Sequence, residues 1–397
     1  MRILSLLLAL GSGDVDGDGC DDVVVADHGE RVSIFSGQTG ERLASFRGDG
    51  EQELRWGANA ETLLVTTPDS RVDVLVYDPV SGHGGWFSPD GTRVGFLPSD
   101  PRAQAPERTH SLLYARAPGG GVFVRHGLVM PDRLQHPNGV DVGMIFAIDV
   151  VGDADQDGVT DFVVARGYGR DDAAAPSAII SGRDGATLHE LQNGEATYAS
   201  AVATVGDLDG DGANEVAVGT LWTRTEEQPY VADERVTLYS SVDGSKIREL
   251  RPSLGPDERA GFGARVLPLG DVDADDVDDF AVSATAHDLG PDEARTGSVT
   301  VFSGKTGARH FTLFGWQARS GFGHHLRSPG DADGDGVADL FIRPRGGRPW
   351  VLVSGADGAL LWAIRQNKEV GYTRAHGFSV EPIAGHGPNV LRLVRRH

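Results

Sequence analysis

The sequence has little cysteine, little positive charge and no long apolar run. Cys20 is the single cysteine among 397 residues, so no disulfide can form within the chain. No apolar stretch reaches the roughly 18 residues of a membrane-spanning helix, and Lys and Arg number 36 against 58 Asp and Glu. Nucleic acid and anionic membrane both require a basic footprint. We therefore expect no nucleic-acid partner and no membrane insertion.

Motifs of common enzyme classes are also missing. The chain has no GxSxG, no P-loop, no HExxH, and no GxGxxG between a strand and a helix. One pair of adjacent histidines, His324-His325, falls on a predicted strand, where neighbouring side chains point to opposite sides. We interpret the pair as packing or channel-lining residues of an inner strand. Metal or acid–base chemistry is the alternative.

One acidic loop sequence occurs five times in the chain, and each copy is followed by a short apolar run. The copies are GDVDGDGCDDVVVA from Gly13, GDADQDGVTDFVVA from Gly152, GDLDGDGANEVAVG from Gly206, GDVDADDVDDFAVS from Gly270 and GDADGDGVADLFIR from Gly330. Each places carboxylates at loop positions 1, 3, 5 and 9. In chain order these are Asp14, Asp16, Asp18 and Asp22; Asp153, Asp155, Asp157 and Asp161; Asp207, Asp209, Asp211 and Glu215; Asp271, Asp273, Asp275 and Asp279; Asp331, Asp333, Asp335 and Asp339.

The chemistry of these loops indicates calcium. Four carboxylates within nine residues repel one another unless a hard cation lies among them, and alternating oxygen ligands suit Ca²⁺. An EF-hand would have Glu at position 12, whereas this position is apolar here, as at Val25, Val164 and Ile342. Position 6, at a sharp turn that favours positive φ, is glycine in four copies and Asp276 in the fourth. The sequence therefore predicts up to five structural Ca²⁺ ions, with vestigial acidic turns as the alternative.

The spacing of the loops predicts a repeat fold. The last four loops lie 54, 64 and 60 residues apart, and the gap of 139 residues from Asp14 to Asp153 leaves room for two further units. Each unit is predicted as four strands, which in one copy are 261–270, 280–284, 298–303 and 310–314. A hairpin turn such as FSGKTGA joins the last two strands, and no segment shows a sustained helical period.

Four-stranded antiparallel units of this length stack radially as the blades of a β-propeller. We predict an all-β fold and a single domain over 1–397 with seven blades. Their approximate bounds are 1–50, 51–95, 96–142, 143–197, 198–257, 258–317 and 318–375, and 376–397 forms a closing or partial blade. Residues 3–10 precede the first loop as a strand precedes the other loops. We expect a strand there rather than a signal peptide, and suspect a truncated or misassigned chain start.

The assembled pattern GFGxxVxxxGDxDxDGxxDxxV resembles the FG-GAP repeat, found in the propellers of integrin α-subunit heads and their bacterial relatives. The sequences 261–263 and 321–323 carry the FG half, and VSA, VAR or VGT replace the literal GAP half. The resemblance covers 143–364 and the unit at 1–50. It implies a seven-bladed propeller with Ca²⁺ between the first two strands of a blade. It also implies an adhesion or binding role at the cell surface or outside the cell.

The loops between second and third strands are expected on the face opposite the acidic loops. Three of them, 166–176, 220–235 and 285–296, are long and belong to consecutive blades, so they are expected to be neighbours. They carry aromatic and charged residues suited to recognition, namely Tyr168, Arg170, Trp222, Arg224, Tyr230 and His287. The alternative is that long loops simply tolerate insertion.

We therefore expect a non-enzymatic module that binds a protein or glycan of unknown identity through this face. A propeller enzyme acting on polysaccharide, as lyase or hydrolase, is one alternative, with Tyr168, His287 and His325 as its candidate acid–base residues. A structural module of a larger surface assembly is the other.

Removal of calcium is expected to lower the melting temperature sharply. A site whose free Ca²⁺ stands tenfold above its dissociation constant stabilises the fold by about 1.4 kcal/mol, so five sites would supply about 7 kcal/mol. That is comparable to the whole stability of an ordinary domain. Calorimetric melting in excess Ca²⁺, and again with chelator at matched ionic strength, measures the difference. An unchanged melting temperature would show that the loops hold no structural ion.

Overall fold

The computed structural model describes most of the chain. The described residues are 13–26, 31–47, 61–66, 72–77, 84–90, 93–96, 113–117, 120–124, 132–135, 141–166, 176–191, 197–223, 231–252, 260–288, 294–345, 349–367, 371–384 and 388–396. Their regular structure consists of β-strands, and these ranges contain no helix. In this part of the chain there is accordingly no apolar helix long enough to cross a bilayer. The all-β expectation is confirmed.

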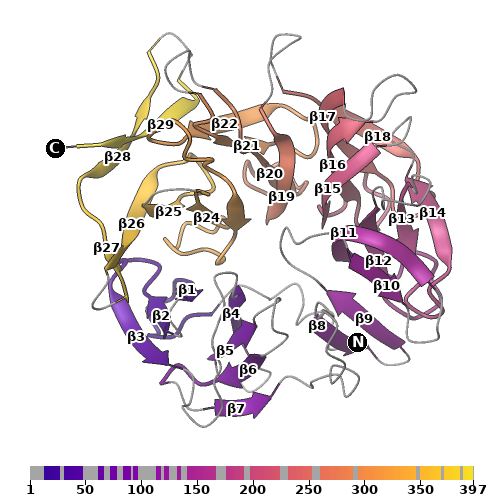
Figure 1. Ribbon diagram of the computed structural model, residues 1–397, viewed down its shortest axis with the longest axis horizontal. Coiled ribbons are helices and arrows are strands. Elements are labelled where there is room, and N and C mark those ends of the chain that lie inside the picture. Colours follow the sequence, from indigo (N-terminus) through magenta and orange to yellow (C-terminus); the bar gives the residue numbers. More distant parts are fainter. Residues whose placement is uncertain are drawn as a thin grey trace.

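The described strands form seven sheets, which follow one another around a common centre (Figure 1). The first three contain β1–β3 (Val23–Ala26, Arg31–Phe35, Arg42–Arg47), β4–β7 (Glu61–Thr66, Val72–Tyr77, Gly84–Phe87, Arg93–Phe96) and β8–β9 (Leu113–Ala117, Gly120–Val124). The next two contain β10–β14 (Asp132–Gln135, Asp141–Gly152, Asp161–Arg166, Ser177–Ile180, Thr187–Leu191) and β15–β18 (Thr197–Thr204, Val216–Thr223, Val231–Tyr239, Lys246–Leu250). The sixth contains β19–β22 (Phe262–Gly270, Asp279–Ala284, Ser298–Phe302, Arg309–Phe314) together with β28–β29 (Phe378–Pro382, Val390–Arg395). The seventh contains β23–β27 (His325–Arg327, Leu340–Arg343, Trp350–Val353, Leu360–Asn367, Gly371–Arg374).

The four-stranded antiparallel unit expected from the repeat is confirmed. In the unit that begins at Gly261, β19 to β22 pair in sequence order and reproduce the predicted strands to within about a residue at most ends. The second strand of a unit follows the acidic loop directly. All residues of β12 and β20 are buried, because these strands have a partner on each side and a neighbouring sheet over each face.

Neighbouring sheets are held together by apolar clusters of buried side chains. One cluster joins the β10–β14 and β15–β18 sheets through Val163, Ile179 and Val218. A second joins β15–β18 to β19–β22, and a third joins β19–β22 to β23–β27. Burial of such side chains is the main favourable term in folding. These four sheets therefore stack face to face and share their cores.

The first and last sheets of the array also share a cluster. Val23, Val25 and Phe35 pack against Trp350, Trp362 and Ile364 of the β23–β27 sheet. The Trp362 indole is 2% exposed, and its Nε1–H donates to the carbonyl oxygen of Gly37 at 2.5 Å. In addition, the backbone N–H of Asp21 donates to the Asp331 carbonyl at 2.8 Å. Residues about 310 positions apart in sequence are thus in direct contact, and β2 of the first sheet contacts β27 of the last.

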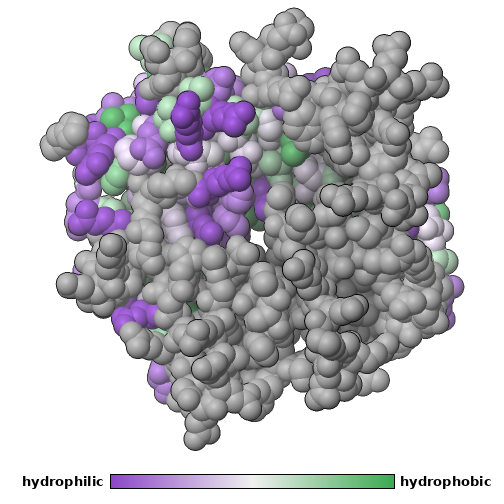
Figure 2. All heavy atoms as spheres, in the orientation of Figure 1, coloured by the Kyte–Doolittle hydropathy of each residue, from purple (hydrophilic) through white to green (hydrophobic). Residues whose placement is uncertain are grey.

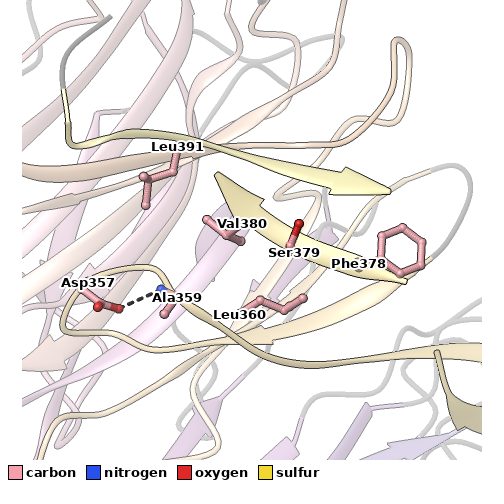
Figure 3. A pocket seen from close by; sticks show the side chains of 7 residues that line it. All are labelled: Asp357, Ala359, Leu360, Phe378, Ser379, Val380 and Leu391. Atoms are coloured by element: carbon pink, nitrogen blue, oxygen red, sulfur yellow. Dashed lines mark hydrogen bonds between the residues drawn. The ribbon is translucent and has the colours of Figure 1, made fainter. Parts of the chain in front are cut away.

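The C-terminal segment 376–397, expected to close the ring or begin a further blade, forms the hairpin β28–β29. Strand β29 pairs in parallel with β22, so that Thr312 lies opposite Val390, and the hairpin extends the outer edge of the sixth sheet. A cavity of about 400 Å³ separates the hairpin from the turn into β26. Leu360, Phe378, Val380 and Leu391 line much of it (Figure 3). The predicted blade number and the predicted strand over 3–10 remain predictions, and the latter lies outside the described residues.

Loss of the Trp362 side chain is expected to loosen the contact between the first and last sheets. Trp362→Ala removes a buried ring and its hydrogen bond, for an expected loss of about 3–5 kcal/mol in the free energy of unfolding. Trp362→Phe keeps most of the packing and is expected to cost clearly less. Urea unfolding of both variants in saturating Ca²⁺ tests this contact. A Trp362→Ala midpoint equal to that of the wild type would mean that the contact adds nothing in solution.

Candidate metal centre and candidate binding face

All five acidic loops fold in the same way around the carboxylate at position 1. One oxygen of this carboxylate accepts the backbone N–H of position 6, as from Gly19 to Asp14 at 2.9 Å and from Gly336 to Asp331 at 2.8 Å. The same bond recurs in the other three loops. Position 6 has positive φ throughout, including 66° at Asp276. The predicted turn is therefore present in the fourth loop as well, although an Asp adopts it there.

The carboxylate at position 9 is buried in every loop. Its exposed fraction is 0–1% at Asp22, Asp161, Glu215, Asp279 and Asp339. One oxygen accepts the N–H of loop position 2, as from Val272 to Asp279 at 2.8 Å, and equivalent bonds form in the other loops. Position 9 therefore fixes the start of its own loop.

In four sheets the second oxygen at position 9 joins the acidic loop to the turn between the third and fourth strands. It accepts the N–H of a turn glycine at 2.9–3.0 Å. These glycines are Gly37, Gly182, Gly304 and Gly355. The sequence predicted this hairpin turn, which begins with Ser-Gly in these four sheets and is called the SG turn below. It did not predict the hydrogen bond between the turn and the acidic loop, although the recurrence of Ser-Gly pointed to a special role for this glycine.

The turn glycines leave no room for a side chain. A Cβ at Gly37, Gly182, Gly304 or Gly355 would lie only 1.9–2.0 Å from the carbonyl oxygen of loop position 8. The fifth sheet is the exception, with Ser241 at the turn and the longer Glu215 at position 9. There one oxygen of Glu215 accepts the Leu208 N–H, while Oε1 has no hydrogen-bond partner. Ser241 is larger than the glycine of the other turns, and Glu215 is one methylene longer than the Asp at position 9 of the other loops.

The loop carboxylates converge closely enough to hold a metal ion. Oxygens of Asp14, Asp16 and Asp18 lie within 4.8 Å of one another, as do those of Asp153, Asp155 and Asp161. The third and fourth loops hold equivalent groups. This all-oxygen donor set, with one buried and several exposed carboxylates, fits Ca²⁺. The ion and its stoichiometry remain predictions.

Burial disfavours the ionised form of the position-9 carboxylates. Burial is the main cause, and the carboxylates of Asp16 and Asp18 a smaller one, of a pKa of about 7 at Asp22. Burial likewise raises the pKa of Asp161 to about 6 and those of Glu215 and Asp339 to about 7. An adjacent cation favours the ionised form, so a bound divalent ion would offset both burial and mutual repulsion.

The face opposite the acidic loops is partly described. Strands β12, β16 and β20 begin beside their acidic loops and end at Arg166, Thr223 and Ala284, so the connections after them leave from the opposite edge, as expected. The predicted bounds of the loop over 220–235 were wrong, because β16 extends to Thr223 and β17 begins at Val231. Tyr168, Arg170, Arg224 and Tyr230 lie outside the described residues. Trp222 belongs to β16, and its side chain is likewise not described.

His287 is therefore the one residue of this predicted set whose side chain is described. Its Nδ1 lies 2.9 Å from the Ser298 hydroxyl, and its ring lies 4.7 Å from that of Phe314. These contacts fix the imidazole against its own sheet. Within the described residues, His287 is thus a packed side chain at the base of its loop.

The histidine pair lies among arginines at the start of β23. The rings of His324 and His325 are 4.7 Å apart. Burial and nearby guanidinium groups, Arg265 for His324 and Arg343 for His325, lower the pKa of His324 to about 4 and that of His325 to about 2. Both imidazoles are therefore neutral at physiological pH.

No protein-family profile matches the chain. Integrin alpha-5 of Xenopus laevis is 29% identical over 203 residues, which cover 48% of this chain and 19% of that protein. Integrin alpha-V of Gallus gallus is 31% identical over 209 residues, with the same coverage. Human integrin alpha-IIb is 32% identical over 166 residues, covering 39% of this chain and 16% of that protein.

The resemblance to integrin α subunits is confirmed. It extends over about half of this integrin α-like chain, and the matches span about a fifth of the length of the first two integrins. The partners and activities of the whole integrin subunits therefore bear on this chain only as proposals.

Solved structures offer weaker likenesses. BBS1N in complex with ARL6DN matches with a TM-score of 0.36 at 12% identity, covering 98% of this chain and 89% of that one. Saccharomyces cerevisiae Sqt1 matches with a TM-score of 0.38 at 11% identity, covering 94% and 78%. Bacillus licheniformis rhamnogalacturonan lyase PL11 matches with a TM-score of 0.35 at 14% identity, covering 96% and 68%. Likenesses of this strength carry no argument about fold or function.

A side chain at the turn glycine is expected to damage both stability and metal binding. Gly304→Ala would force its Cβ against the Asp278 carbonyl, so the turn must shift away from Asp279, at an expected cost of about 1–3 kcal/mol. Ser241→Ala is the matched control, because that turn already accommodates a Cβ. Urea unfolding and calcium titration of both variants test the link. Equal stability and calcium affinity in the two variants would contradict it.

Proposed function

We propose that the chain is a calcium-stabilised β-propeller of seven blades that acts as a non-catalytic ligand-binding module. The contact between the first and last sheets supports closure of the ring. The seven consecutive sheets support the blade number. Up to five Ca²⁺ ions, one in each acidic loop, would neutralise the carboxylates at one edge of the sheets.

The observation that carries the binding role is the separation of the two faces. The acidic loops and the SG turns are locked together on one face by the buried carboxylates of position 9. The long loops after β12, β16 and β20 leave from the other face and are free to vary on a rigid scaffold. The resemblance to integrin α subunits supports an adhesion-type role for such a module. We place it outside the cell or at the cell surface, with a protein or glycan as ligand.

The chain is expected to bind a component of a glycan and matrix-protein array when calcium is present. Binding should disappear with chelator, because the loops of the binding face are positioned by the calcium-dependent scaffold. Trp222→Ala should abolish binding while the protein remains folded and calcium-loaded. The matched control is Val242→Ala, since Val242 is an exposed apolar residue (42%) on the calcium face.

The outcome of the array distinguishes the alternatives. Binding that survives Trp222→Ala but is lost in Val242→Ala would place the ligand on the calcium face. A folded, calcium-loaded protein that binds nothing would contradict the proposal and favour a structural module. Turnover of an arrayed polysaccharide would favour the enzyme.

A further inference from the structure

The fourth acidic loop, 271–279, differs from the other loops in one neighbouring side chain. This side chain, His310, comes from β22, the last strand of the four-stranded unit. In the five sheets that have an acidic loop, this strand carries a β-bulge at the same place, one residue after its first paired residue. A bulge re-aims the side chain of the extra residue. The bulged residues are Leu43, Leu188, Ile247, His310 and Leu361. Four sheets thus have an aliphatic side chain where the sixth sheet has an imidazole.

His310 is aimed at the carboxylates of its loop but bonds to neither. Its Nε2 lies 3.6 Å from Asp279 Oδ2 and 3.7 Å from Asp273 Oδ2. Both separations are too long for a hydrogen bond. Moreover, Nε2 is buried and has no hydrogen-bond partner, an arrangement that costs free energy. The Nε2 atom therefore lies between two loop carboxylates without a hydrogen bond to either, on a side chain that is 20% exposed.

The spacing of these atoms suits a shared ion. The ligand atoms of Asp273, Asp279 and His310 all lie within 4.8 Å of one another. Nitrogen and oxygen ligands lie about 2.0–2.2 Å from Zn²⁺, so the two measured separations can be spanned by one ion between the groups. Ca²⁺ takes oxygen ligands, whereas imidazole suits zinc and other transition metals. The fourth loop therefore has, besides the all-oxygen group of Asp271, Asp273 and Asp275, a second group in which His310 adds a nitrogen ligand.

We propose that the fourth acidic loop is a site for a nitrogen-accepting divalent metal such as Zn²⁺, held by His310, Asp273 and Asp279. The other four loops keep the all-oxygen donor set of a calcium site. This inference rests on the proposed function in one respect, namely that the acidic loops hold metal ions. The departure at position 6, Asp276 in place of glycine, falls in the same loop and fits a site that has diverged from the rest.

A competing role for His310 is that of a counter-ion. A protonated imidazole between two carboxylates would neutralise the loop without any metal. The two roles differ in what they bind, because a counter-ion takes up no Zn²⁺ and a metal ligand does.

The test is a Zn²⁺ titration by calorimetry in millimolar Ca²⁺, which fills the oxygen loops, with bound ions counted by native mass spectrometry. Wild type is expected to bind one Zn²⁺ tightly. His310→Leu, which installs the residue that other sheets already use, should bind it at least about tenfold more weakly. His376→Leu is the control for surface histidines, since His376 is exposed, and should leave the tight site unchanged.

A gain-of-function variant completes the test. Leu361→His places the imidazole beside the fifth loop and should add a second Zn²⁺ site. Equal Zn²⁺ binding by wild type and His310→Leu would overturn the inference, as would a wild type that takes up calcium alone. In both cases calcium bound in the other loops would leave the proposed function intact. Absence of calcium from every loop would instead remove the proposed function.

Discussion

The fold depends on keeping five buried carboxylates ionised at the junction of two loops. Each position-9 carboxylate accepts one N–H from its acidic loop, and in four sheets also one from the turn of the third and fourth strands. Two hydrogen bonds offset only part of the cost of burying a charge. The neighbouring loop carboxylates add repulsion, which a bound cation would offset. The loop carboxylates also account for the acidity of the chain. Without these twenty residues, the sequence has 38 acidic and 36 basic residues.

The same loops lie where neighbouring sheets meet. The carboxylate of Asp21, next to the first buried carboxylate, accepts the N–H of Asp331 in the last loop at 3.1 Å. Asp278 approaches Gly206 in the same way, so that a Cβ at Gly206 would lie 2.2 Å from its Oδ2. A cation in one loop would therefore influence the contact with the adjacent sheet. Metal binding would be coupled to the stacking of the sheets through the side chains of Asp21 and Asp278 at loop position 8.

Local patterns in the sequence were sufficient to predict the strands, the acidic loops and the positive φ at position 6. Each of these features is decided within about ten residues, by alternation of apolar side chains or by a turn. The hydrogen bonds of Gly37, Gly182, Gly304 and Gly355 were not predictable in this way, because they join segments 15 to 25 residues apart. The parallel pairing of β29 with β22 and the bulge that aims His310 are likewise set by tertiary register. The candidate binding residues fall mostly outside the described part of the chain, and their role remains a proposal.

Hydrogen exchange of individual backbone amides, with calcium and with chelator, tests most directly whether a cation holds the two loops together. The account predicts that the N–H groups of Gly37, Gly182, Gly304 and Gly355 are protected in calcium and become fast-exchanging on chelation. When the chelator is added, backbone amides at the centres of β12 and β20 should keep more of their protection from exchange than the turn amides do. Turn amides that exchange equally slowly in both conditions would show that the carboxylate link forms without the ion, and would contradict the central role given to the metal.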